Sequence, residues 1–85
     1  MSEKMSINIE VLGINTIHNY IVPSNMSVFK IIGLITKTLL EEYSALEENG
    51  QTNHLLIQAN SGKVLTSNCS LSQLGIVNGE KLVFI

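Results

Sequence analysis

Apolar and polar residues alternate in two stretches near the N-terminus. In residues 7–11 (INIEV), Asn8 and Glu10 separate the apolar positions, and this period of two is typical of a strand with one face in water. Residues 17–22 (IHNYIV) alternate less clearly. We expect the face that lacks Asn19 to point inward, because the other choice would bury an amide. Turn residues between the two stretches predict an antiparallel hairpin.

The next stretch has the period of an α-helix. Ser27 is the predicted N-cap, because it directly precedes the apolar run. At about 100° per residue, one helix face collects seven side chains: Val28, Ile31, Ile32, Ile35, Leu39, Tyr43 and Leu46. Two positions for the C-terminal end of the helix fit this pattern. The pair Asn49-Gly50 is a good stop, but glutamates at 47–48 would lie at the negative end of the helix dipole, which favours an end near Tyr43.

The C-terminal half predicts short strands joined by turns. Residues 54–59 (HLLIQA) indicate a third strand, and residues 64–65 (VL) a short one that pairs back. The stretch 70–76 (SLSQLGI) has apolar residues at the spacing of a single helical turn, which would fix the loop to the core. Asn78-Gly79 then reverses the chain into a final strand at 81–85 (KLVFI).

The final strand needs neighbours, because an apolar strand with a bare edge invites aggregation. We therefore place it inside the sheet beside the first strand, with Leu82 and Phe84 buried. The order of the elements predicts an α+β fold, in which one main helix packs on one face of a mixed sheet of four to five strands. We assign residues 6–85 to this domain and residues 1–5 to a flexible N-terminus.

Composition excludes several classes of protein. Hydrophobic residues make up 45% of the 85 residues and charged residues 14%, which favours a globular domain. No apolar run approaches the roughly 20 residues that span a bilayer, and the start (MSEKMSIN) has no apolar signal segment. We therefore expect no membrane insertion and a cytoplasmic location. The net charge is −2 and arginine is absent, which argues against nucleic-acid binding.

Candidate chemistry is sparse. The separations of His18, His54 and Cys69 match no zinc-binding pattern. The stretch NSGKV is similar to a phosphate loop, but Ile57 occupies the position of a required glycine and Val64 that of a required serine or threonine. A Ser-His-Asp triad is impossible without aspartate. We expect no enzymatic activity, no cofactor and no metal.

The ending SLSQLGIVNGEKLVFI resembles the ubiquitin fold, the β-grasp, and the resemblance covers about residues 6–85. The residues that carry this resemblance are Leu71, Leu74, Gly75-Ile76, Asn78-Gly79-Glu80, Leu82 and Phe84. With the Val-Pro pair after the second strand, the chain is similar to the YukD/EsaB-like family, small bacterial ubiquitin-fold proteins encoded with type VII secretion systems. The resemblance implies a cytoplasmic accessory or regulatory protein that binds a protein component of the secretion machinery.

Ubiquitin-type modifiers carry a flexible tail that ends in Gly-Gly, whose carboxylate is activated for conjugation. This chain ends in Val83-Phe84-Ile85, so we expect a protein that is not conjugated. The alternative function is that of a sulfur carrier or protein modifier.

Two surfaces are candidates for binding. On the helix, Phe29 and Leu40 lie at about 100° and 120° from the start of the apolar face, beside Gly33. They either widen the core contact or form a docking stripe for a partner or a second copy, in a homodimer. Leu34 lies on the outer side.

On the open sheet face, Ile17 and Ile21 point outward in the favoured alternation. Aligned with ubiquitin, Gln58 takes the place of the central isoleucine of the recognised patch, opposite the helix. A glutamine there would weaken the patch, so recognition by ubiquitin receptors is not expected. The candidate interaction surface consists of Phe29, Leu34, Leu40, Ile17, Ile21 and Gln58.

Overall fold

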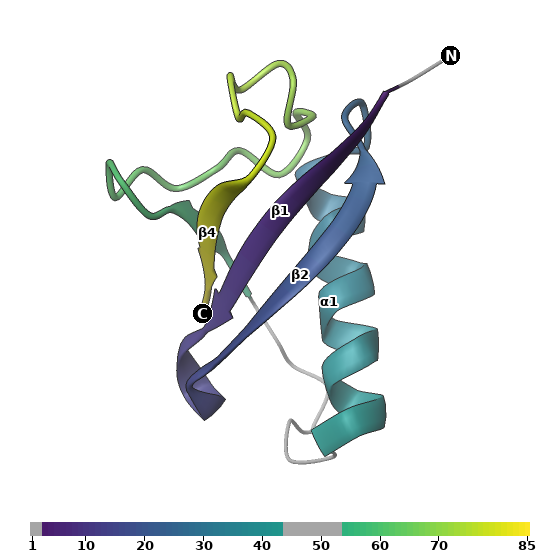
Figure 1. Ribbon diagram of the computed structural model, residues 1–85, viewed down its shortest axis with the longest axis vertical. Helices are drawn as coiled ribbons and strands as arrows, with labels where there is room; N and C mark the ends of the chain where they lie inside the picture. The colour runs from purple at the N-terminus through teal and green to yellow at the C-terminus, as the bar shows by residue number, and fades with distance from the viewer. Residues whose placement is uncertain (1–2, 44–53) are drawn as a thin grey trace.

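Four strands and one α-helix build the described part of the chain (Figure 1). The structure is a computed structural model that describes residues 3–43 and 54–85. Its elements are β1 (Lys4–Val11), the 3-10 helix η1 (Leu12–Ile14), β2 (Thr16–Pro23), α1 (Val28–Tyr43), β3 (Leu56–Gln58) and β4 (Glu80–Phe84). α1 lies across one face of the sheet, which confirms the predicted α+β architecture.

The last strand, β4, lies inside the sheet. The strand order is β2-β1-β4-β3, with β4 parallel to β1 and antiparallel to β3. Leu82 and Phe84 of β4 are buried, as predicted. The sheet has four strands because residues 64–65 do not form a strand of their own: Val64 makes only an isolated antiparallel bridge to Ile57. The mixed sheet of the prediction is confirmed.

β1 and β2 form the predicted antiparallel hairpin in one uninterrupted register. β1 begins earlier than the pattern indicated, because Lys4 and Met5, which the sequence assigned to a flexible N-terminus, pair with Pro23 and Val22. Asn15 takes the left-handed conformation in the turn, with a φ of 54°, a geometry that asparagine tolerates better than most residues. The inward face of β2 is the one predicted.

The predicted apolar face anchors α1 on the sheet. Val28, Ile31, Ile35 and Leu39 are buried, and the Ser27 hydroxyl accepts a hydrogen bond from the Lys30 N–H at 3.2 Å, as an N-cap does. α1 is assigned to Val28–Tyr43. The later end predicted at residues 49–50, and the predicted contribution of residue 46 to the apolar face, lie outside the described residues.

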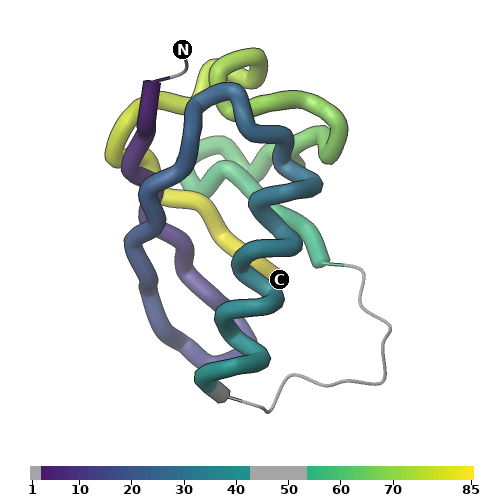
Figure 2. The backbone as a smooth tube through the Cα atoms, turned by 90° about the vertical axis from the view of Figure 1, so that its right-hand side faces the viewer, coloured from purple at the N-terminus to yellow at the C-terminus, as the bar shows by residue number. Residues whose placement is uncertain are grey.

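A polar loop after β3 caps the N-terminal end of α1. The first amides of a helix have no partner inside it. Here the Val28 N–H donates to the Cys69 carbonyl and the Phe29 N–H to the Ser67 carbonyl, both at 2.9 Å. Figure 2 shows the loop beside the start of the helix. Leu71 and Ile76, in the turn that follows, are buried and fix the loop to the core as predicted.

One hydrophobic core lies between α1 and the sheet, with contributions from every strand. Its buried members are Ile7, Ile9, Val11, Val22, Val28, Ile31, Ile35, Leu39, Leu56, Leu65, Leu71, Ile76, Leu82 and Phe84. Within residues 3–43 and 54–85, no helix combines the length and the apolar character needed to cross a bilayer.

Candidate protein-binding surfaces

The outer side of α1 exposes large apolar side chains. Phe29 is 71% exposed and Leu40 is 40% exposed. The interpretation that these two residues widen the core contact is therefore wrong, because both lie beyond the stripe that meets the sheet. Leu34, on the outer side as predicted, is exposed as well. Exposed apolar side chains gathered on one helix face are typical of a protein-binding site.

These side chains border a groove of about 800 Å³, which we call the α1 groove. Its lining residues are Met26, Phe29, Lys30, Ile32, Gly33, Leu34, Thr36, Lys37, Leu40, Glu41 and His54. Gly33 lies in the middle of α1, where glycine costs about 0.5–1 kcal/mol relative to alanine. A Cβ atom at Gly33 would meet no heavy atom within 4 Å. Nothing in the described fold therefore requires a glycine here.

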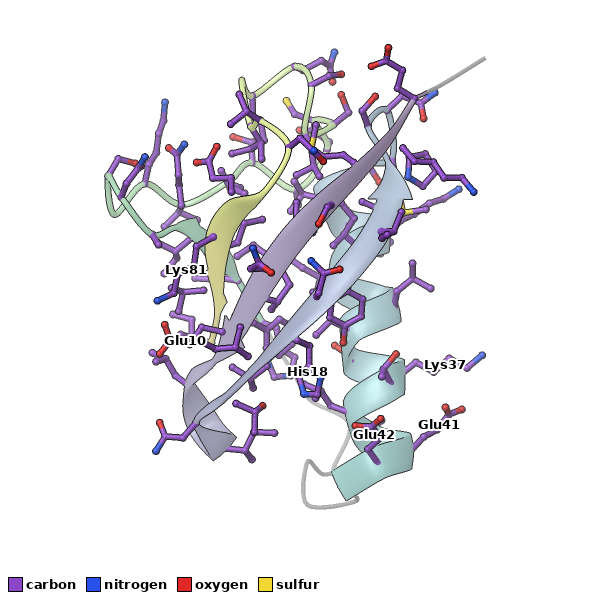
Figure 3. All side chains as sticks on the ribbon, in the orientation of Figure 1. Glu10, His18, Lys37, Glu41, Glu42 and Lys81 are labelled. Carbon is purple, nitrogen blue, oxygen red and sulfur yellow. The ribbon has the colours of Figure 1, made fainter. Side chains whose placement is uncertain are left out.

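Charged residues lie beside the apolar part of the groove. Lys30 and Lys37 are exposed and lie along it, with Glu41 one turn beyond Lys37. Figure 3 shows Lys37 and Glu41 extending outward from the same side of α1. At the other wall, the His54 ring stacks on Phe84 with ring centroids 4.6 Å apart, and His54 Nδ1 lies 3.1 Å from the Ile85 carbonyl oxygen. The groove therefore has an apolar centre with two lysines beside it.

A second exposed apolar pair lies on the open face, the sheet face turned away from α1. Ile17 is 61% exposed and Ile21 is 64% exposed, in the orientation that the alternation of β2 predicted. Between them, Asn19 Nδ2 donates to Ser6 Oγ at 2.8 Å. Farther across this face, Lys81 and Glu10 form an ion pair with Nζ and Oε1 3.0 Å apart (Figure 3).

Gln58 lies on the opposite face of the sheet from the one predicted. It pairs with Leu82, whose side chain is in the core. Its Nε2 donates to the Glu80 carboxylate, and its Oε1 accepts from Ser61 Oγ at 2.8 Å. Because side chains alternate along a strand, an alignment shifted by one residue reverses the face. Gln58 is thus held by polar neighbours at the α1 side of β3.

Ile57, one residue earlier, has the orientation that was assigned to Gln58. It pairs with Val83 and forms the bridge to Val64, so apolar residues do lie on the open face of β3 and β4. Gln58 therefore gives no reason to expect that ubiquitin receptors fail to recognise this face. The sequence did not predict the orientation of Ile57, because Leu55, Leu56 and Ile57 are consecutive apolar residues. Without alternation, the pattern does not show which of them point to the open face of the sheet.

The residues considered for metal binding or nucleophilic chemistry lie on separate elements. His18 is in β2, where its ring centroid is 6.3 Å from that of Tyr20, whereas His54 stacks on Phe84. Cys69 is in the loop at the start of α1, and its Sγ lies 3.9 Å from Asn68 Oδ1. Among the residues that the structure describes, no three His, Cys, Asp or Glu side chains gather as metal ligands would.

Comparison with solved structures identifies the fold. The ubiquitin-like domain of EccD5 from Mycobacterium xenopi superposes with a TM-score of 0.77 at 19% sequence identity, over 98% of this chain and 93% of that one. The chain has the ubiquitin-like fold. Models of protein families give no match to the sequence, and a search of curated proteins gives none either.

Two further solved structures are similar in fold. The ubiquitin-like domain of the Mycobacterium tuberculosis type VII secretion system protein EccD1 has a TM-score of 0.68 at 16% identity, over 98% of each chain. A chain of the ESX-5 inner membrane complex has a TM-score of 0.76 at 18% identity, over 96% of this chain and 20% of that one. At these identities the likeness shows the ubiquitin-like fold, and the α1 groove and the open face are its candidate surfaces here.

Proposed function

We propose that this ubiquitin-like protein is an accessory or regulatory component of a type VII secretion system. It acts in the cytoplasm by binding another protein of the machinery, without catalysis and without being conjugated, as the resemblance to the YukD/EsaB-like family implies. Supporting this, similar solved structures include ubiquitin-like domains of type VII secretion proteins and a chain of the ESX-5 inner membrane complex.

The observation that carries the binding role is the α1 groove with Gly33 in its lining. Exposed Phe29 and Leu40 beside a glycine form a hollow that an apolar side chain of a partner can fill. A glycine inside a helix is typical where another chain must approach the backbone closely. Lys30 and Lys37 lie beside this hollow. The partner segment is therefore apolar, with carboxylates placed to meet these two lysines.

β4 is held firmly at the centre of the sheet. Leu82 and Phe84 are buried, and Ile85 exchanges two backbone hydrogen bonds with Leu55, both at 3.1 Å. That the protein is not conjugated is what the resemblance to the YukD/EsaB-like family implies. Mass spectrometry of the protein isolated from its own cells tests this: unmodified chains support the proposal, and isopeptide-linked or thiocarboxylated forms contradict it.

Secretion in a deletion strain tests the binding role. We expect the wild-type gene to restore export of type VII substrates and Phe29→Glu to fail, because a carboxylate would be buried in the apolar groove. Val77→Glu is the matched control, since Val77 is also a largely exposed apolar residue and lies outside the groove. Circular dichroism verifies that both variants fold. Full restoration by Phe29→Glu would contradict the proposed site.

A direct titration identifies the partner. The purified protein is titrated with each cytoplasmic domain of the secretion system from the same organism, at low and at high salt. We expect one domain to bind, with an affinity that falls in Lys37→Glu and in high salt, because the lysines face carboxylates. Binding that is unaffected by Lys37→Glu and by Phe29→Glu would show that another surface is used.

A further inference from the structure

β2 forms one outer edge of the sheet, and among the described residues no segment protects it against pairing with another strand. The two ends of the strand order are β2 and β3. Beside β3, the Gln58 N–H donates to the Lys63 carbonyl and the Leu65 N–H to the Leu56 carbonyl, both at 2.9 Å. In the part of the chain that the structure describes, no such segment is recorded beside β2, whose register partner is β1. The β2 edge therefore has the geometry to accept another strand.

The sequence of β2 favours such pairing. Natural edge strands are blunted by lysine, proline or a bulge. Residues 16–22 contain no lysine, glutamate or proline, and their register with β1 runs without a bulge. Proline occurs only at the last position, Pro23. An edge of this length without a charge is a pairing surface rather than a protected one.

The exposed residues of β2 are arranged symmetrically about Asn19. Ile17 precedes it by two positions and Ile21 follows it by two, and both are exposed on the open face. If two copies pair antiparallel about a two-fold axis at Asn19, each Ile17 lies opposite the Ile21 of the other copy. Shifting the axis by one residue in either direction places an isoleucine opposite Asn19 instead. The symmetric register is thus the one that matches both isoleucines.

We propose that two copies of this chain associate through antiparallel pairing of their β2 strands about a two-fold axis at Asn19. The axis is perpendicular to the sheet, so the two sheets become one and both α1 helices lie on the same side. Each chain has a net charge of −2, but the paired segments carry no charged side chain, so no like charges face each other across the strands. The α1 groove lies on a different element and is not covered by this contact.

Sedimentation of the full chain from micromolar to millimolar concentration tests the proposal. We expect a reversible monomer–dimer equilibrium whose dissociation constant rises about tenfold in Ile21→Lys, since the change removes two symmetry-related isoleucine pairs. Val64→Lys, on an exposed apolar residue at the opposite edge of the sheet, is the control and should leave the constant unchanged. A protein that stays monomeric throughout overturns the proposal, as does an equal effect of the two variants.

Two experiments test the register. An equimolar mixture of Ile21→Lys with Ile17→Glu should regain wild-type affinity, because lysine and glutamate then lie opposite each other. In a Cys69→Ser background, Asn19→Cys should form an intermolecular disulfide under mild oxidation, because residues opposite each other in paired strands have the Cα separation that a disulfide needs. Ile57→Cys, on β3, should not. Failure of both the mixture and the Asn19→Cys cross-link would exclude pairing centred on Asn19.

Discussion

Replacing Gly33 by alanine should make the protein more stable and weaken its binding to a partner. Gly33 is an exposed position inside α1, and a Cβ there would meet nothing within 4 Å. The helix should therefore gain the full difference in propensity, about 0.5–1 kcal/mol. For a domain of this size that gain raises the melting temperature by about 2–8 °C. The same methyl group occupies the hollow of the α1 groove.

Thermal unfolding followed by circular dichroism measures the first effect, and titration with the proposed secretion partner measures the second. Gly33→Leu extends the series, because leucine is also a good helix former and fills more of the groove. Thr38→Ala is the control. It too replaces a weaker helix former by alanine, but Thr38 does not line the groove, and its hydroxyl only donates to the Leu34 carbonyl at 2.9 Å.

If Gly33 serves binding, changes at this position should affect stability and partner affinity in opposite directions. Gly33→Ala and Thr38→Ala should both raise the melting temperature, whereas binding should fall in Gly33→Ala and further in Gly33→Leu but not in Thr38→Ala. Such a trade-off between stability and activity is expected of a residue kept for function. If Gly33→Leu binds as tightly as the wild type, the glycine does not serve the partner and the α1 groove is not the site.

Three further changes probe the fold. Phe84→Ala should lower the free energy of unfolding by about 3–5 kcal/mol, because the ring is buried in the central strand. Urea denaturation measures the change, and a loss below about 1 kcal/mol would mean that the ring is not part of the core. Ser27→Ala should cost about 0.5–2 kcal/mol through loss of the N-cap, and Ser27→Asp should retain most of the stability. Glu10→Gln should cost less than about 1 kcal/mol, an effect that vanishes in high salt, since its ion pair with Lys81 is partly exposed; a loss that persists in high salt would point to a different role.

The elements that could be predicted are those whose pattern is local. The alternation in residues 7–11 and the helical face from Val28 to Leu39 each determine which side is buried without reference to the rest of the chain. The central position of β4 followed from one physical argument, the hazard of an apolar edge. It holds because Leu82 and Phe84 are apolar at alternate positions and pack below α1.

The features that were missed depend on contacts between distant segments. Where β3 begins, the run Leu55–Ile57 has no alternation, and the orientation of β3 is fixed by pairing with β4, in which Leu56 lies opposite Phe84. The exposure of Phe29 likewise depends on what lies beside the helix, which a helical angle near the border of the apolar face does not reveal. The candidate site could thus be placed on α1 from the sequence, but its groove could not.

The start of α1 is fixed by contacts that also position the exposed Phe29. Its backbone N–H is bonded to the Ser67 carbonyl, and that of Val28 to the Cys69 carbonyl, so the first turn is fixed by a loop far away in the sequence. A helix end held in this way does not fray, and the aromatic side chain projects from a fixed backbone. Less conformational freedom is then lost when a partner covers the ring, which lowers the entropic cost of binding. The loop after β3 therefore contributes to the α1 groove without lining it.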